Sequence, residues 1–345
     1  MKYGGDYWNI KELLPYQRNF NFINSVRNAG KSYTCAGFAI DRFLNKDEKS
    51  LLLVRTVDEK KSGALQKWFT KVCNREFPNV PLVFTSDCLY YAPDKDRDTW
   101  SIITYCRALS EAVKVKKQSF PGVKWLFMDE YMLEPKHYDL YVKGWNEPDL
   151  LLNIYHTVDR EEDYVTCFLL GNNTAFYNPY HLHQAFQIPP CSPGEIWYSE
   201  NVLFQRYEIT KSMEERKKKN RFLRMVEGTS YGKYAKDGVY VGDNENFIAQ
   251  KTGRSNFIFS FKFDSDNFGV WFDSRINRVY ISSKLPAGSR VHLSLDTVGS
   301  ETDIRVGRKN SLIKWLVKKY SMACVYYESM EIKLKAQEII ERKML

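Results

Sequence analysis

The chain has 345 residues, of which 43% are hydrophobic and 27% are charged, a composition ordinary for a soluble globular protein rather than a disordered or membrane chain. Its 51 basic and 42 acidic residues give a net charge of +9, which favours a polyanionic partner without requiring one. The seven cysteines are scattered without a CxxC pair, so neither a disulfide framework nor a zinc site is predicted. No apolar run approaches the roughly 20 residues needed to cross a bilayer, so we expect a cytoplasmic protein with no membrane partner.

The length predicts about two domains. Between residue 19 and about residue 174, short apolar runs alternate with amphipathic stretches, as in strands joined by helices in a largely parallel sheet. Runs such as LLLV at 51–54 and WLFM at 125–128 are continuously apolar, which is typical of strands buried on both faces. The expected strands are 19–25, 50–56, 80–86, 100–106, 123–130 and 164–172. The first domain is therefore predicted to have an α/β fold.

The residue pattern changes near Ile188. The segment IPPCSPGE contains three prolines and a glycine, which indicate an inter-domain boundary. The charged segment that follows is interpreted as a helical linker. Beyond it, three closely spaced strand candidates predict an antiparallel meander within a second α/β domain. Those strands are 256–264, 267–274 and 278–284, with further strands at 291–296 and 323–329 and helices at 309–320 and 328–343. The predicted divisions are 1–194, 195–227 and 228–345.

A phosphate-binding loop is indicated by SVRNAGKS at residues 25–32, which follows a predicted strand and precedes a predicted helix. Gly30 permits close approach of the backbone to phosphates, Lys31 supplies a cation and Ser32 a hydroxyl for Mg²⁺. The usual pattern has glycine where Ser25 stands, and serine can turn there if its φ stays negative. The alternative is a chance GKS, which the flanking strand and helix disfavour. The predicted nucleotide-binding residues are Ser25, Arg27, Asn28, Ala29, Gly30, Lys31, Ser32 and Tyr33.

A carboxylate pair, Asp129 and Glu130, ends the apolar strand KWLFM. Asp129 is suited to hold Mg²⁺ together with Ser32, and Glu130 to accept a proton from the attacking water. Acids also occur at ordinary solvated strand ends, and alone the pair would favour that interpretation. Together with the loop at Lys31, it predicts hydrolysis of ATP with Mg²⁺ as cofactor.

Other residues are candidates to complete this site. Asn172, Asn173 and Thr174 follow a predicted strand and are placed to sense the γ-phosphate, although Asn and Gly also favour a simple turn. Arg160 is the first choice and Arg55 the second for an arginine that completes a neighbouring subunit's site, and the alternative for each is an ordinary ion-paired arginine. Gln17 is a candidate for contact with the adenine from its position alone.

Several of these segments resemble the large terminases and packaging ATPases of tailed phages: Arg27 within the loop, then SLLLVRT, WLFMDE and GNNT. Glutamate directly after the magnesium-binding aspartate resembles the additional-strand catalytic-glutamate class of P-loop ATPases. GTSYGKYAKDGVYVGDNENFI, at 228–248, is similar to the terminase segment that connects the ATPase to an RNase H-like nuclease domain.

The short chain looks most like the compact packaging ATPases of the phi-twenty-nine type. That resemblance implies an ATP-driven translocase that packages double-stranded DNA into a viral procapsid. It further implies a homo-oligomeric ring, a pentamer, that docks on the portal of the procapsid in the host cytoplasm, with a packaging RNA as a further partner.

The second domain is predicted to be RNase H-like without nuclease activity. Such nucleases need several carboxylates that converge on two metal ions. The acids near the predicted strand ends, Asp264, Asp266, Asp273, Asp296 and Asp303, form an incomplete pattern, and the resemblance implies a vestigial, nucleic-acid-binding domain. Two alternatives stay open: a complete terminase with an active metal-dependent nuclease, and a nonmotor nucleic-acid-binding ATPase or assembly scaffold.

A basic run in the predicted linker is suited to bind DNA phosphates without sequence preference. Its members are Lys217, Lys218, Lys219, Arg221 and Arg224. The alternative is a solvated helix face balanced by Glu214 and Glu215.

Overall fold

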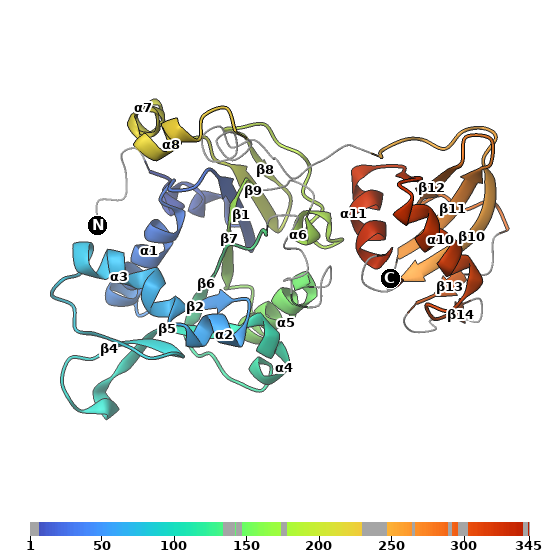
Figure 1. Cartoon of the computed structure of the whole chain (residues 1–345). Helices are drawn as coiled ribbons and strands as arrows, with labels where there is room; N and C mark the ends of the chain where they lie inside the picture. The colour runs from blue at the N-terminus through green and yellow to red at the C-terminus, as the bar shows by residue number, and fades with distance from the viewer. Residues whose placement is uncertain are drawn as a thin grey trace. The chain divides into compact units, whose positions relative to one another are not determined.

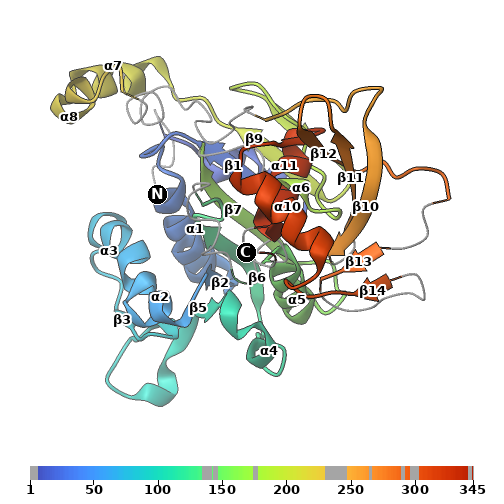
Figure 2. The same ribbon diagram turned by 45° about the vertical axis from the view of Figure 1, so that its right-hand side comes forward.

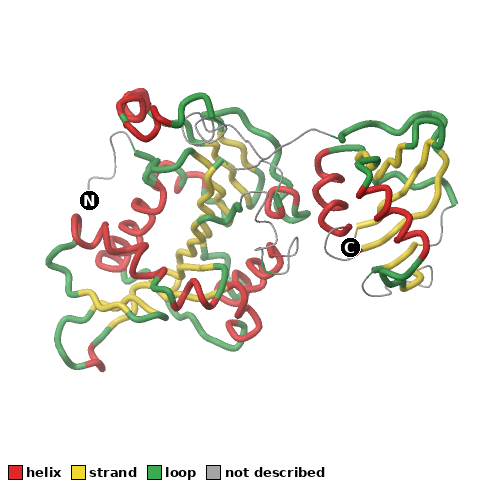
Figure 3. Tube along the Cα trace, in the orientation of Figure 1, coloured by secondary structure: helices red, strands yellow, loops and turns green. Residues whose placement is uncertain are grey.

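The computed structural model describes residues 7–133, 142, 147–173, 178–229, 247–263, 266–288, 292–295, 303–340 and 344. The chain forms two compact units, residues 1–242 and 243–345, and each is described by itself (Figure 1). Helices and strands alternate along the first unit (Figure 3). Within the described residues, no helix combines the length and the apolar character needed to cross a bilayer.

The first unit is built on a sheet whose described strands run in the order β3-β4-β5-β2-β6-β7-β1-β9-β8. The six strands from β5 to β9 in this order are parallel, and β3, β4 and β8 pair antiparallel at the two edges. The strands are β1 Phe20–Ser25, β2 Lys49–Val54, β3 Leu82–Phe84, β4 Cys88–Tyr91, β5 Ser101–Ala108, β6 Val123–Asp129, β7 Thr166–Asn172, β8 Ile196–Tyr198 and β9 Val202–Arg206. The predicted α/β fold with a largely parallel sheet is confirmed.

Helices cover both faces of this sheet, which is why its central strands are apolar throughout. Figures 1 and 2 show α1 (Lys31–Lys46) and α3 (Ala64–Glu76) on one side and α5 (Glu147–Asp159) on the other. Phe38 of α1 and Phe127 of β6 belong to one continuous buried core. The shorter helices are α2 Val57–Lys61, α4 Ala112–Val115, α6 Pro179–Leu182, α7 Lys211–Lys219 and α8 Arg221–Met225, with 3₁₀ turns at Ile10–Glu12, Leu14–Tyr16, Arg97–Thr99 and Leu109–Glu111.

The segment 195–227 is predicted to be a helical linker, but its first part forms two strands of the sheet. β8 and β9 lie within residues 195–206, and β9 pairs parallel to β1, next to the edge strand β8. The prolines near Ile188 therefore end regular structure only locally, and the chain returns because Val202, Leu203 and Phe204 bury their side chains. The helices α7 and α8 follow, still in the first unit.

The second unit is a sheet of order β14-β13-β10-β11-β12-β15 among the described strands. β10, β11 and β12 form the predicted antiparallel meander, and β13, β14 and β15 are added in parallel. Both described helices contribute to one core with the meander. The elements are β10 Asn256–Phe263, β11 Asp266–Asp273, β12 Arg278–Ser282, β13 His292–Ser294, β14 Asp303–Arg305, α10 Ser311–Ser321, β15 Val325–Tyr327 and α11 Met330–Ile339.

Because each unit has its own core, we expect Phe268→Ala to destabilise only the second unit. Phe268 is 1% exposed and stacks on Phe261 with ring centroids 4.9 Å apart. Truncating a buried phenylalanine costs about 3 to 5 kcal/mol of the free energy of unfolding. Urea unfolding monitored by limited proteolysis and mass spectrometry should show early cleavage confined to residues 243–345.

Ile304→Ala is the matched control, because Ile304 is 52% exposed in the same unit. Its free energy of unfolding should change by no more than about 0.5 kcal/mol. Equal loss of protection in both units of the Phe268→Ala protein would contradict the independence of the two cores.

Candidate active site

The loop between β1 and α1 has the backbone that phosphate binding requires. Asn28 and Gly30 have positive φ values of 66° and 91°, and α1 begins at Lys31. A Cβ atom at Gly30 would lie 3.0 Å from the Cβ and Cδ1 atoms of Tyr7, so a side chain is disfavoured there by both backbone and space. Ser25 is absent from the positive-φ residues, which explains how serine replaces the usual glycine. The loop therefore keeps its shape despite this departure.

Lys31 is held inside the loop. Its side chain is buried, and Nζ donates to Ser25 Oγ at 2.5 Å. Burial lowers the pKa of Lys31 to about 8, and the negative charge of Asp129 opposes this shift. A buried lysine with few compensating partners favours an anionic ligand, which restores the pKa and stabilises the charged form.

Asp129 and Glu130 lie at the carboxyl end of β6, as predicted. The Trp68 indole Nε1–H donates to Asp129 Oδ2 at 3.0 Å, and the Glu130 amide donates to Asp129 Oδ1 at 3.0 Å. Glu130 has a left-handed φ of 53°, which turns the chain sharply after the strand. Loss of solvent around its carboxyl group, followed by the charge of Asp129, raises the pKa of Glu130. A raised pKa suits a proton acceptor.

The strand β7 lies between β1 and β6, and its carboxyl end completes the cleft. Asn172 lines the cleft, and the Asn173 amide donates to the Ser25 carbonyl at 3.1 Å. Gly171 allows close packing, because a Cβ there would lie 2.6 Å from Asn24 Oδ1 and 2.7 Å from Tyr131 Cε1. Thr174 lies outside the described residues.

These elements surround a cleft of about 680 Å³. It is lined by the loop residues Arg27 to Thr34 and by Asp129, Glu130 and Asn172, so parts distant in sequence converge. Mg²⁺ is commonly bound by one or two protein oxygens together with substrate phosphates and waters. The hydroxyl of Ser32 and the carboxylate of Asp129 fit that donor set, and the lysine and loop amides fit a polyphosphate.

The cleft also contains residues that sequence analysis missed. Tyr7 and Trp8 lie against the loop: the Trp8 amide donates to the Ala29 carbonyl at 3.0 Å, and Trp8 Nε1 donates to Gln205 Oε1 at 2.7 Å. On the outer side, Lys71, Arg75 and Glu76 of α3 line the cleft, and Tyr33 Oη donates to Glu76 Oε1 at 2.9 Å. The spacing of Lys71, Arg75 and Glu76 in the sequence does not by itself predict that they line a nucleotide cleft.

Gln17 is not part of this cleft. It lies just before β1, whereas the loop follows the opposite end of the same strand. A strand of six residues spans roughly 20 Å, so Gln17 and the loop lie at opposite ends of β1. Gln17 is also absent from the residues that line the cleft, and its contact with the adenine stays a prediction.

Arg55 follows β2 and forms a buried ion pair within the chain. Its Nε lies 3.0 Å from Glu147 Oε2, and its Nη2 donates to the carbonyls of Glu130 and Tyr131 at 3.3 and 3.1 Å. The Glu147 side chain is fully buried and also accepts from Tyr180 Oη at 2.7 Å. Arg55 therefore holds the turn that carries Glu130.

Arg160 lies at the end of α5, on the edge of the sheet from which β6 and β7 start. Its Nη2 donates to Ser119 Oγ at 3.3 Å. It does not line the cleft of its own chain.

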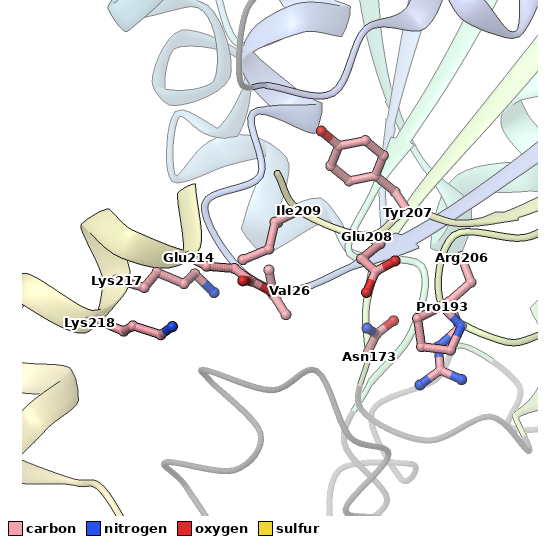
Figure 4. A pocket seen from close by; sticks show the side chains of 10 residues that line it. All are labelled: Val26, Asn173, Pro193, Arg206, Tyr207, Glu208, Ile209, Glu214, Lys217 and Lys218. Carbon is pink, nitrogen blue, oxygen red and sulfur yellow. The ribbon is translucent and has the colours of Figure 1, made fainter. Parts of the chain in front are cut away.

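The basic residues of the predicted linker lie on α7 and α8. Lys218, Lys219, Arg221 and Arg224 are exposed, whereas Lys217 is half-buried. Lys217 and Lys218 line a separate hollow beside the loop (Figure 4).

In the second unit, the described acids are paired rather than gathered. Lys262 Nζ lies 2.9 Å from Asp303 Oδ2, and Lys335 Nζ lies 3.2 Å from Asp266 Oδ2. Asp273 accepts from Thr252 Oγ1 at 2.6 Å. Asp264 and Asp296 lie outside the described residues. The described part of the chain contains no group of three or more His, Cys, Asp or Glu residues able to hold a metal.

Comparison with known proteins shows the family of this chain. The model of the podovirus DNA encapsidation protein (Gp16) matches residues 4–345. The chain is 30% identical over 277 residues to the DNA packaging protein of Bacillus phage phi29, covering 80% of this chain and 79% of the relative. It is 27% identical over 271 residues to that of Bacillus phage B103, covering 79% of each.

Solved structures agree in fold. The chain superposes on the packaging motor assembly of bacteriophage phi29 with a TM-score of 0.72 and 25% identity, covering 99% of this chain and all of the other. The DNA packaging motor of phi-28 gives a TM-score of 0.63 at 18% identity, with 98% of each chain covered, which shows the fold alone. The resemblance predicted from the sequence is thus confirmed, and the chain belongs to the podovirus DNA encapsidation protein (Gp16) family.

Proposed function

We propose that the chain hydrolyses ATP at the cleft between β1 and β6 and uses the energy to move double-stranded DNA into a viral procapsid. The observation that carries this proposal is the convergence of Lys31 with Asp129 and Glu130 in one cleft. Lys31 begins the helix after β1, whereas the two acids stand at the end of β6. The chain belongs to a DNA encapsidation family, and this membership is the basis for proposing DNA and the procapsid as partners.

The loop would bind the phosphates of ATP through its amides and Lys31, with Ser32 and Asp129 as ligands of Mg²⁺. The metal would neutralise charge on the transferring phosphate oxygens. Glu130 would accept the proton of the attacking water, and its raised pKa brings the proton affinity of its carboxylate closer to that task. Asn172 would contact the terminal phosphate from β7.

Three finer assignments have structural support. The position of β7 between the loop strand β1 and the carboxylate strand β6 supports the additional-strand catalytic-glutamate class. The antiparallel meander extended by parallel strands, with helices packed on it, supports an RNase H-like second unit. In that unit, Lys262 and Lys335 neutralise two of the candidate acids, which supports a domain without nuclease activity.

The motor would work as a ring on the portal of the procapsid, five subunits and a packaging RNA being the arrangement implied by the phi-twenty-nine type. The match to a packaging motor assembly over the whole chain supports the ring. In such a ring Arg160 remains the candidate for completing the neighbouring subunit's site, because Arg55 is engaged with buried Glu147. Lys218, Lys219, Arg221 and Arg224 are exposed candidates for contact with DNA phosphates.

Steady-state ATP hydrolysis tests the active site directly. Lys31→Ala should abolish turnover by removing the phosphate-binding cation, and Glu130→Gln should bind ATP yet hydrolyse it at least about 100-fold more slowly. Turnover of the unaltered protein should rise with duplex DNA.

Glu161→Gln is the matched control, because the Glu161 side chain is 82% exposed, lies 3.1 Å from His156 Nε2 and does not line the cleft. Rapid ATP hydrolysis by Lys31→Ala or Glu130→Gln would contradict the assignment of these two residues to the active site. Turnover indifferent to DNA would favour a nonmotor ATPase, and metal-dependent nicking of DNA would favour a complete terminase.

Gly30→Ala should weaken ATP binding by about 5- to 30-fold, because an alanine in the left-handed region costs roughly 1 to 2 kcal/mol and its Cβ would press on Tyr7. Gly63→Ala is matched to it: Gly63 has a similar φ of 82°, but nothing lies within 4 Å of its added Cβ. Calorimetric titration with a non-hydrolysable ATP analogue should show unchanged affinity in Gly63→Ala. Equal losses in the two variants would rule out the steric explanation.

Mixing experiments separate the roles of the two arginines. Arg160→Ala alone should lower turnover about 1,000-fold if Arg160 acts across subunits. Mixing this protein with Lys31→Ala should restore part of the activity, since the Lys31→Ala subunits donate an intact Arg160. Arg55→Lys should lose turnover and gain nothing from the same mixture, because Arg55 supports Glu130 of its own chain.

Recovery in the Arg55→Lys mixture would show that Arg55 acts across the interface. Lysine is used at this position because Arg55→Ala would leave Glu147 buried and unpaired, at a cost of about 3 to 5 kcal/mol.

A further inference from the structure

A hollow of about 350 Å³ lies next to the phosphate loop, separate from the nucleotide cleft. Figure 4 shows Glu214 and Lys217 of α7 pointing toward Val26 of the loop. Glu208 and Asn173 line another part of the hollow. Asn173 is 4% exposed, and its Oδ1 has no hydrogen-bond partner within the part of the chain that the structure describes. The hollow therefore begins where β1 and β7 end.

Lys217 differs from the other basic residues of α7. Arg216, Lys218 and Lys219 are exposed, whereas Lys217 is half-buried against the loop. Lys217 also lines a neighbouring hollow together with Arg27 and Asn28. One lysine on α7 thus contacts the space on two sides of the phosphate loop.

The helix is held in this position by contacts of its own. Arg216 Nη1 donates to Tyr7 Oη at 3.2 Å, and the guanidinium lies 5.0 Å from the centre of the Tyr7 ring. Tyr7 in turn lies against Gly30. Met213, on the same helix, is 4% exposed. α7 is therefore linked to the loop through Tyr7, while most of its own residues are exposed.

The charges around the loop are mostly of one sign. Arg27 and Lys31 line the nucleotide cleft, and Lys217 lines a neighbouring hollow together with Arg27. Glu208 and Glu214 share the hollow with Lys217 and balance part of this charge. A polyphosphate on the loop would offset the positive charge of Lys31 and of Arg27, the loop residue beside which Lys217 lines the neighbouring hollow.

We propose that Lys217 is a nucleotide-binding residue that supplies a second cation to the phosphates of ATP, in addition to Lys31, and does not serve to grip DNA. This inference rests on the proposed ATP-binding function. It moves Lys217 from the set of expected DNA contacts to the active site. It also makes α7 a helix whose contact with the loop is strengthened when nucleotide is bound.

The test compares Lys217→Ala with Lys211→Ala, which removes the same charge from an exposed position on the same helix. Binding of a non-hydrolysable ATP analogue is measured by calorimetric titration of the full chain. Lys217→Ala should bind on the order of 10- to 100-fold more weakly, as expected for a lost charge-assisted contact. Lys211→Ala should keep the affinity of the unaltered protein, and Lys217→Arg should recover most of it.

DNA binding is measured in parallel over a range of salt concentrations. The slope of log affinity against log salt should be the same for Lys217→Ala and the unaltered protein, because a lost phosphate contact on DNA would reduce it by about one. Unchanged analogue affinity in Lys217→Ala, or equal losses in Lys217→Ala and Lys211→Ala, would overturn the inference.

Failure of the inference is distinguishable from failure of the proposed function. If Lys31→Ala weakens binding and Lys217→Ala does not, only the role of Lys217 is wrong. If the unaltered protein does not bind the analogue at all, the ATP-binding proposal itself fails. Thermal melting of Lys217→Ala excludes misfolding as the cause of a loss.

Discussion

The parallel hydrogen bonding of β1 to β7 and of β7 to β6 determines where every residue of the cleft lies. Because the three strands point the same way, their carboxyl ends meet at one edge, and the loop, Asn172 and the Asp129–Glu130 pair face one another. The register Ser25↔Asn172 and Asp129↔Leu170 brings these ends level. A shift in either pairing would separate the phosphate-binding residues from the carboxylates.

Much of this arrangement could be predicted because its signals are local. Lys31 and Ser32 belong to a contiguous loop motif, and Asp129 and Glu130 stand at the end of a continuously apolar strand. The positions of these residues can therefore be predicted from the residues next to them in the sequence. For Gln17 nearness along the chain is a weaker guide, because the length of β1 separates it from the loop. The family resemblance extended the interpretation to the second unit, whose meander was visible in its strand spacing.

The remaining features depend on contacts that no local pattern encodes. The sequence around Tyr7 does not show that this side chain lies against Gly30. The sequence around Arg55 likewise does not show its ion pair with buried Glu147, which is 92 positions away in the chain. The strands β8 and β9 follow a proline-rich segment that favours termination, and only the buried face of Val202–Phe204 explains their return to the sheet. Pairing of Asp266 with Lys335 likewise joins residues far apart in the chain.

One feature of the first unit bears on how the protein is made. β1 carries the phosphate loop, yet on one side it is bordered by β9, and buried Trp8 donates its indole proton to Gln205. During synthesis the amino-terminal residues emerge from the ribosome long before residues 202–206 do. The nascent chain therefore exposes an unpaired edge of β1 until about three-fifths of the protein has been translated. An exposed apolar strand edge is a site for unwanted pairing, so this edge of β1 is open to other chains until β9 has been made.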